Sequence, residues 1–405
     1  MLKTIYGAAF AVLMTSAPAW GAVATITAEH DYDGARPAEV IAIPFAEIAR
    51  VLPDARMFHL IVRDAKGRLL ASQITNYEHD HRGATYDDLV FSYDFAAGEK
   101  RAAFTVESIA AATPPEKPCT YARQVPERYD DMAWENDRIA HRMYGPALNS
   151  PAAGGERLRG SGIDIWGKRV VYPIIDRWYA KGHDQFHKDE EAEGLDLYSI
   201  GGSRGAGGTG VWDGKKLWTS DNYAAARVLS SGPRRAAFKL TYAAWNAGAS
   251  ASASETKQFT IDCGRNLHAI ESVFDFERSD MTIGIGITAH PRVQGFAEPV
   301  LTKDPNGRWM SLWEESRHGG LGVAVVLAKD TPSEGVAYEA GATNKDNGNY
   351  LVLVKAQRGA PVRYFAGAGW SGSGQFKDRL AWERYVKDFH DRSQHPISVQ
   401  VTNGS

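Results

Sequence analysis

The sequence is poor in features that would each have indicated a class of protein. It has two cysteines, Cys119 and Cys263, in 405 residues, a formal net charge of −3, and no apolar stretch near the roughly 20 residues that a membrane-spanning helix needs. The small net charge gives no basic footprint for nucleic acid and no reason to expect a protein partner. Long Leu-rich periodic runs are also missing, whereas glycine and aromatic residues are plentiful. This composition favours a mainly β protein.

The first 22 residues have the order of a secretory signal peptide. Lys3 precedes an apolar run over residues 5–14, and small residues follow, so we expect cleavage between Ala19 and Ala22. No cysteine follows the run to accept a lipid. We therefore expect a periplasmic or secreted protein with no membrane association after cleavage. An exported protein permits a disulfide between the two cysteines, and the sequence leaves open whether they meet.

Strand-length segments fill two parts of the chain. Over 23–109, short alternating runs separated by turn residues predict an N-terminal β-sandwich, in which 44–53 could instead be a short helix. Residues 110–120 are rich in Ala and Pro and predict a linker. Over 121–405, further strand-length segments predict a large antiparallel β-sandwich, supersandwich-like, with few helices. The clearest helix, over 374–392, is expected to pack against that sandwich.

The stretch from Trp134 to Trp212 concentrates residues that bind ligands and move protons. It contains, in order, WENDR, HRMYGP, DIWGKR, YPIIDRWY, GHDQFHKD, EGLDLY and GGSRGAGG. Trp, Tyr, His, Arg and Asp alternate there, whereas a plain core would favour Leu, Ile and Val. We therefore interpret this stretch as the wall of a functional site.

Two histidines in this stretch, His183 and His187, are four residues apart with acidic residues beside them. On a helix their imidazoles would share a face, as metal ligands often do, but the segment has no strong helical period. Acid–base chemistry is the favoured interpretation, because an imidazole both accepts and gives a proton near neutral pH. A polar surface loop is the alternative without a function.

Arg204 lies in the glycine-rich run SRGAGG, which lacks the Lys-Ser/Thr ending of a phosphate-binding loop. The glycines permit tight turns and are expected to leave the guanidinium exposed in a cleft, where it could hold a carboxylate through two parallel hydrogen bonds. A structural ion pair with Glu193 or Asp196 is the alternative.

Aromatic and acidic residues of the stretch support carbohydrate chemistry without choosing a mechanism. The aromatic side chains offer flat faces for sugar rings, although half or more of them are expected to be core. If residues 134–138 form a strand, polar residues occupy both of its faces, which indicates a cleft or an edge. Many carboxylate pairs could serve glycoside hydrolysis, and no pair stands out.

The motifs also resemble those of a known family. WENDRIAHRMYGP, SGIDIWGKR, YPIIDRWY, FHKD, EGLDLYSIGGSRGAGG and the later ETK and NLHAIES are similar to motifs of secreted bacterial proteins long described as a domain of unknown function. Members of that family occur with polysaccharide-degrading enzymes, and one is an oligosaccharide dehydratase of ulvan breakdown. The resemblance covers most of the mature chain. It implies a substrate ending in a uronic acid, from which the enzyme removes the C5 proton and expels the C4 hydroxyl, whereas a lyase would expel a glycosidic oxygen.

Matching these motifs to that chemistry implies the roles of individual residues. His187 in FHKD would be the base, Tyr172 in YPIID the acid, and Arg204 the group that grips the carboxylate, with Lys168 as a second candidate for that grip. The remaining candidates would bind substrate: His141, His183, Trp134, Asn136, Arg138, Trp166 and Trp212. Of these, His141 and His183 are also reserves for the proton-transfer roles.

The chain departs from the family pattern at one point. Glu190, Glu191 and Ala192 intervene between HKD and EGLD, where one or two residues are expected. This difference lies beside the proposed base and puts its alignment in doubt.

The implied elimination requires no cofactor, and the sequence leaves open whether a divalent cation such as Ca²⁺ assists. It specifies neither the polysaccharide nor the oligomeric state. Two alternatives come from other classes. One is a glycoside hydrolase or mutarotase-like enzyme that depends on a carboxylate or His–carboxylate pair, and the other is a non-catalytic carbohydrate-binding protein.

Overall fold

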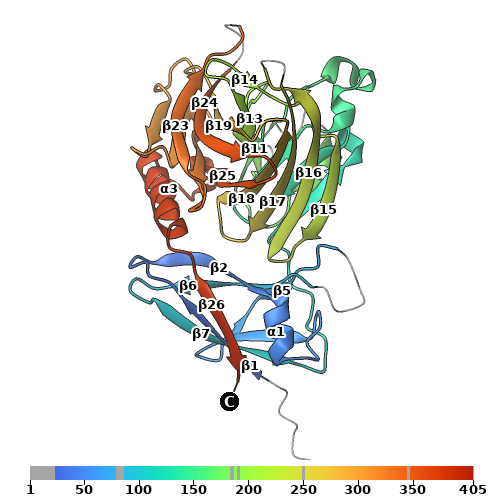
Figure 1. Ribbon diagram of the computed structural model, residues 1–405, viewed down its shortest axis with the longest axis vertical. Coiled ribbons are helices and arrows are strands. Elements are labelled where there is room, and N and C mark those ends of the chain that lie inside the picture. Colours follow the sequence, from blue (N-terminus) through green and yellow to red (C-terminus); the bar gives the residue numbers. More distant parts are fainter. Residues whose placement is uncertain are drawn as a thin grey trace, which may run out of the picture.

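The computed structural model describes residues 23–78, 86–182, 187–188, 192–248, 251–343 and 347–404. Within these ranges the chain forms a small β unit and a larger one, drawn below and above in Figure 1. The sheets are antiparallel, which confirms the predicted mainly β, sandwich-rich fold. The predicted signal peptide lies outside the described residues. Over the part of the chain described, no helix is both long and apolar enough to cross a membrane.

The small unit is a sandwich of two antiparallel sheets, with strand orders β26-β1-β7-β3-β4 and β2-β6-β5. Alternation along β1 buries Ala24, Ile26 and Ala28 in its core. The short helix that was an alternative for 44–53 is present as α1, which buries Phe45 and Ile48. The bounds of these elements are β1 Val23–Glu29, β2 Arg36–Pro44, α1 Phe45–Val51, β3 Leu60–Asp64, β4 Leu69–Leu70, β5 Ser72–Ile74, β6 Asp88–Phe95, β7 Arg101–Ser108 and β26 Ser398–Asn403.

The last strand of the chain belongs to the small unit. β26 pairs antiparallel with β1, from Ala24 opposite Asn403 to Glu29 opposite Ser398, and runs along the small unit in Figure 1. The expected assignment of all of 121–405 to the large unit is therefore wrong at its C-terminal end. The physical reason is that β26 satisfies the backbone groups along the edge of β1, which would otherwise be unpaired.

The large unit contains three antiparallel sheets. An eight-stranded sheet has the order β15-β16-β17-β18-β25-β22-β21-β20. Its bounds are β15 Ala225–Ser231, β16 Arg235–Asn246, β17 Ser252–Asp262, β18 Leu267–Phe276, β20 Val300–Lys303, β21 Trp309–Ser316, β22 Gly319–Leu327 and β25 Pro361–Trp370. A five-stranded sheet, β14-β13-β19-β24-β23, consists of β13 Ala206–Trp212, β14 Leu217–Trp218, β19 Asp280–Ala289, β23 Ser333–Glu339 and β24 Gly348–Gln357.

The third sheet carries most of the unusual sequence, and we call it the motif sheet. Its order is β12-β11-β10-β9-β8, with bounds β8 Tyr121–Val125, β9 Asp131–Glu135, β10 Ile139–Met143, β11 Asp164–Lys168 and β12 Gly194–Asp196. The helix α2 follows β11, and short 3-10 turns complete the unit: α2 Ile175–Lys181, η1 Pro126–Arg128, η2 Pro146–Asn149, η3 Pro151–Glu156 and η4 Ser371–Ser373.

The eight-stranded sheet organises the large core. One of its faces packs on both five-stranded sheets, so that Trp134 of β9 contacts Phe238 and Phe259 with ring centroids 5.0 Å apart in each case. The other face is covered by α3, Arg379–Ser393, whose Trp382 and Phe389 are buried. The predicted helix is therefore present and packs as expected. It begins at Arg379, because the Asp378 side chain caps it by accepting from the backbone N–H of Ala381 at 2.8 Å.

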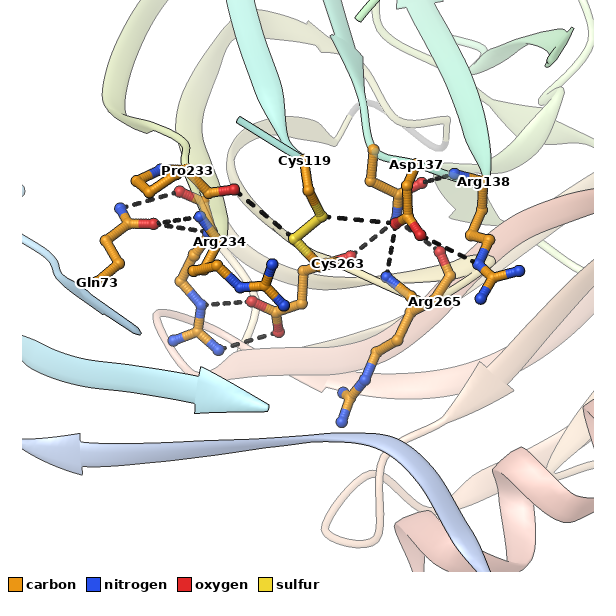
Figure 2. The surroundings of a disulfide bond; sticks show 12 residues. Gln73, Cys119, Asp137, Arg138, Pro233, Arg234, Cys263 and Arg265 are labelled. Atoms are coloured by element: carbon orange, nitrogen blue, oxygen red, sulfur yellow. Dashed lines mark hydrogen bonds and ion pairs between the residues drawn. A yellow bond between two sulfur atoms is a disulfide. The ribbon is translucent and has the colours of Figure 1, made fainter. Parts of the chain in front are cut away.

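A disulfide lies near the junction of the two units. Cys119, at the end of the predicted linker, is bonded to Cys263 in the turn after β17, with Cα atoms 5.8 Å apart. Figure 2 shows Asp137 and Arg138 on one side of this bond and Gln73 of the small unit on the other. The disulfide therefore fixes the chain where it passes from one unit to the other.

Candidate functional site

The motif sheet has two faces with different chemistry. Because side chains alternate along a strand, Asp131 of β9, Arg142 of β10 and Asp164 of β11 share one face. Trp178 and Tyr179 of α2 pack on this face, beside Trp166, and we call it the helix-covered face. The opposite, interior face carries Trp134 and His141 and packs on the eight-stranded sheet.

Three buried aspartates surround one guanidinium on the helix-covered face. Arg142 lies with its Nη2 2.9 Å from Oδ2 of Asp164 and 3.5 Å from Oδ2 of Asp196, and its Nη1 is 3.9 Å from Oδ2 of Asp131. All four side chains are at most 5% exposed. Tyr179 donates its hydroxyl to Asp131 at 3.3 Å. We call these four residues, Asp131, Arg142, Asp164 and Asp196, the aspartate cluster.

One guanidinium cannot neutralise three buried carboxylates. Burial raises the pKa of Asp164 to about 7, assisted by repulsion from Asp196 and opposed by Arg142. Burial also raises the pKa of Asp196 and of Asp131 to about 6, and Arg142 again opposes the shift. Burial therefore moves the pKa values of these carboxyl groups from the range of ordinary aspartates toward neutral pH.

Two accessible side chains lie beside β12, the strand that contributes Asp196 to this cluster. His187, with a side chain 45% exposed, places Nδ1 3.7 Å from Oδ2 of Asp196. Tyr172, also about half exposed, donates its hydroxyl to Oε1 of Glu193 at 2.8 Å. The two partners, Glu193 and Asp196, are three residues apart at β12, a span of about 10 Å in extended chain. One short strand therefore holds the predicted base and the predicted acid on the same part of the molecule.

Lys168, the second candidate for gripping a carboxylate, is occupied within the protein. Its Nζ lies 2.5 Å from Oε2 of Glu135 and 2.7 Å from the carbonyl oxygen of Asn136, and the side chain is 1% exposed. Glu135 also accepts hydrogen bonds from the backbone N–H groups of Ile174 and Ile175 at the start of α2. Burial raises the pKa of Glu135, and Lys168 opposes this. The pair attaches α2 to the sheet, so Lys168 does not present its charge to a ligand.

The expectation that glycines leave Arg204 exposed is wrong. The residue is 1% exposed, and its guanidinium donates to Ser161 Oγ at 2.9 Å and to the carbonyl oxygens of Gly202 and Thr209, not to Glu193 or Asp196. The glycines have another use, since a Cβ at Gly286 would lie 2.5 Å from Cβ and Cγ of Arg204. They make room for the arginine inside the sheets, where burial lowers its pKa to about 10.

His141 on the interior face packs against His268 of β18 in the eight-stranded sheet; both have fixed tautomers, and we call them the histidine pair. His141 Nδ1 lies 2.9 Å from the carbonyl oxygen of Asp164, which only accepts, so Nδ1 carries the proton. Trp134 donates its indole N–H to Nδ1 of His268 at 3.0 Å, so the proton of His268 is on Nε2. The rings are 4.9 Å apart. Burial lowers the pKa of His141 to about 4 and that of His268 well below its usual value.

Among the other predicted binding residues that the structure describes, Trp166 lies opposite Asp196 on the neighbouring strand, and the rest lie away from His187. Trp134 and Trp166 are 1% and 0% exposed, so neither ring offers a face to a ligand. Asn136 donates to the carbonyl oxygens of Asp262 and Arg265, and Arg138 lies beside the disulfide in Figure 2. Trp212 ends β13 in another sheet, and His183 lies outside the described residues. Sequence proximity grouped these residues, whereas strand alternation and the turns separate them.

The sequence interpretation missed Arg142, the centre of the aspartate cluster, and left its three aspartates among many acidic residues. The sequence did not show how β10 and β11 are aligned, and this register places Arg142 opposite Asp164. His268, 127 residues after His141, had no signal beyond its place in the motif NLHAIES.

Across the described ranges, no group of three or more His, Cys, Asp or Glu side chains is arranged to hold a metal ion. Arg142 is the cation that the three aspartates share.

Comparison with known proteins gives matches over nearly the whole chain. A model of the family described as "Domain of unknown function (DUF4861)" matches residues 29–399. "Uncharacterized protein P7" of Formosa agariphila is 29% identical over 384 residues, which are 93% of each chain.

Two solved structures also match, an alpha-mannosidase from Enterococcus faecalis V583 and an Enterococcus faecalis protein in glycosyl hydrolase family 38. Both have a TM-score of 0.49, with identities of 11% and 12%. The matches cover 94% of this chain and 46% and 47% of the others, so the chain spans about half the length of these structures. A likeness of this degree does not transfer an activity.

Proposed function

The chain belongs to the family described as a domain of unknown function (DUF4861), and we propose that this member is a carbohydrate-active enzyme that eliminates water or a glycosidic oxygen from uronic-acid-containing oligosaccharides. The observation that carries the proposal is the arrangement at β12. A half-exposed His187 faces Asp196 there, and a half-exposed Tyr172 donates to Glu193 three residues away.

His187 is the proposed base that removes the C5 proton. Asp196 faces Nδ1, which favours the tautomer with its proton on Nδ1 and the lone pair on Nε2. The same carboxylate stabilises the imidazolium that forms when Nε2 takes the proton. A base and its orienting carboxylate in this geometry typically contribute about 10²- to 10⁴-fold.

Tyr172 is the proposed acid for the C4 leaving oxygen. Its hydroxyl donates to Glu193, which also lies 3.0 Å from Nη2 of Arg177. To protonate the leaving oxygen, the Tyr172 hydroxyl turns its proton from Glu193 to that oxygen. The Arg177 guanidinium, 5.9 Å from the Tyr172 ring and paired with Glu193, offsets the charge of the phenolate. Atoms balance in this scheme: C5 loses a proton to His187, the C4–O bond breaks, and the expelled oxygen leaves protonated.

The substrate carboxylate needs a cation that solvent can reach. Arg177, whose side chain is 57% exposed, and Lys181, at 29%, lie on α2 beside Glu193. We therefore assign the carboxylate to Arg177 rather than to Arg204 or Lys168, whose charges are directed into the protein. A guanidinium there withdraws charge from the carboxylate and makes the C5 proton more acidic.

One observation favours a second candidate, a glycoside hydrolase. The raised pKa of Asp196, about 6, suits a general acid, and Glu193, directly before β12, supplies a second carboxyl group. Hydrolysis would release sugars without forming an unsaturated product.

The test is to incubate the mature protein with a panel of uronic-acid oligosaccharides, following ultraviolet absorbance and the mass of every product. Loss of one water with rising absorbance supports a dehydratase, and chain shortening with rising absorbance supports a lyase. Released sugars without absorbance support the hydrolase. Binding without any product, for every oligosaccharide, contradicts both enzyme assignments.

His187→Ala and Tyr172→Phe should each reduce turnover at least 100-fold with the fold retained. Matched controls exist in His395→Ala, another half-exposed histidine beside an aspartate, 2.7 Å from Asp31, and Tyr338→Phe, a tyrosine 56% exposed. Full activity in both site variants would show that the reaction occurs elsewhere.

A further inference from the structure

A cavity of about 320 Å³ lies between the two units, away from the site described above. The small unit and the segment that leads into it contribute Arg36 and Glu39 of β2 with Pro396, Ile397 and Val399. The large unit contributes Arg265 from the turn after β17, and the end of α3 contributes Arg392. In Figure 2, Arg265 extends from the disulfide-linked turn toward the strands of the small unit. The walls thus come from segments that meet only when the two units dock.

One carboxylate serves three guanidiniums in this cavity. Glu39 lies 3.1 Å from Nε of Arg36, 2.5 Å from Nη2 of Arg265 and 3.5 Å from Nη1 of Arg392. Lys329, an exposed residue, adds a fourth cation to the lining. The lining therefore carries four cationic side chains and a single anionic one.

Arg36 and Arg392 both find backbone carbonyl acceptors within the protein. Besides Glu39, Arg36 donates to the carbonyl oxygens of His395 and Arg392, which follow and end α3 and carry the negative end of the helix dipole. Arg392 donates to the carbonyl oxygens of Asp388 at 3.3 Å and Pro37 at 3.2 Å, and Arg265 donates to Glu39. Burial lowers the pKa of Arg392, and Arg265 and Arg36 lower it further, while Glu39 raises it. The cavity thus keeps an excess of positive charge partly removed from water, which is costly unless an anion joins it.

We propose that this junction cavity is a binding site for a small oxyanion, either a free phosphate or sulfate ion or the carboxylate of a sugar acid. Guanidinium groups recognise all three through paired N–H donors. Because its walls belong to both units, the bound anion also stabilises their docking.

The experiment is a titration of the mature protein with sodium phosphate, sodium sulfate or glucuronate at constant ionic strength, with sodium chloride as reference. Thermal unfolding and calorimetry are measured together. We expect saturable binding that raises Tm by about 3 °C when the anion is at a hundredfold excess over its Kd. Phosphate or sulfate binding without glucuronate binding indicates a free ion, and the reverse order indicates a sugar acid.

Substitutions separate this site from general screening. Lys329→Gln, an exposed change that should not affect folding, is expected to weaken binding severalfold, and Arg265→Gln at least tenfold. Glu39→Gln removes the competing carboxylate and should tighten binding. Arg358→Gln, at a surface arginine paired with Asp275, is the matched control and should change nothing. Equal effects of chloride and the oxyanions, or unchanged binding in Lys329→Gln and Arg265→Gln, would overturn the proposal. Turnover is not measured, so the result is independent of the proposed elimination.

Discussion

The two faces of the motif sheet bury ionisable groups in opposite ways. On the helix-covered face, burial raises the pKa of three aspartates, so the folded protein favours their protonated form. At the interior face, burial lowers the pKa of His141 and of His268, which packs against it from β18, so the fold favours their deprotonated form. On both faces burial disfavours the charged form of the side chains, and the faces differ in their access to solvent. The aspartate cluster borders the half-exposed His187, whereas the histidine pair is enclosed between sheets. A similar desolvation can therefore prepare a reactive site on one face and a structural core on the other.

The largest effect is expected from Arg142→Met, which leaves three buried carboxyl groups without their cation. We expect a loss of about 3–5 kcal/mol in the free energy of unfolding at pH 7.5, measured by urea denaturation. The loss should shrink at pH 5, where the carboxyl groups are protonated. Arg363→Met, at an exposed arginine paired with Glu271 and Asp330, should cost at most about 1 kcal/mol. A loss that stays equal at both pH values would contradict the assigned charge imbalance.

Asp196→Asn should increase the free energy of unfolding, whereas Arg142→Met should decrease it. A carboxyl group whose folded pKa is raised contributes stability below its unfolded pKa, near 4, and loses it as pH rises through about 6. Replacing it with the neutral amide should therefore stabilise the fold by about 1–3 kcal/mol at pH 7.5 and by little at pH 4. Turnover should fall, because His187 loses its partner. Asp275→Asn, at a carboxylate 66% exposed, is the control for stability. Destabilisation by Asp196→Asn at pH 7.5 would refute this account of the cluster.

Stability that depends on His141 of the interior face should fall as pH falls, whereas the stability that depends on Asp196 falls as pH rises. The folded pKa of His141, about 4, lies below its unfolded value of 6.5, so its neutral form stabilises the fold at pH 7 and this contribution is lost on acidification. Between pH 7 and 5, His141→Gln should lose about 2 kcal/mol less than the wild type, measured by urea denaturation at each pH. Parallel curves for wild type and His141→Gln would show that His141 is not held neutral.

The smallest effect concerns the hydrogen bond that fixes His268. Trp134→Phe removes the indole donor to Nδ1 and should cost about 1 kcal/mol beyond its change in packing. Nitrogen NMR of the wild type should find the His268 proton on Nε2 and the His141 proton on Nδ1. Opposite tautomers would contradict the donor assignments on this face.

Local patterns predicted the parts of this protein that depend on local physics. Alternation predicted the strands of the small unit, and the spacing of Trp382, Val386 and Phe389 predicted α3. The sequence also identified the stretch that contains His187 and Tyr172. It could not choose among the acidic residues, because Asp131, Asp164 and Asp196 come together only through the register of separate strands.

The sequence by itself determined that the chain is β-rich and where its chemically dense region lies, because both follow from composition and from periods of two to four residues. Tertiary structure alone decided three other things. It buried Arg204 among glycines, paired β26 with β1 of the small unit, and placed Arg142 at the centre of three aspartates. Each depends on contacts between residues from 11 to several hundred positions apart. Burial, which such contacts create, changes the pKa of a carboxyl group or an imidazole far more than its neighbours in sequence do.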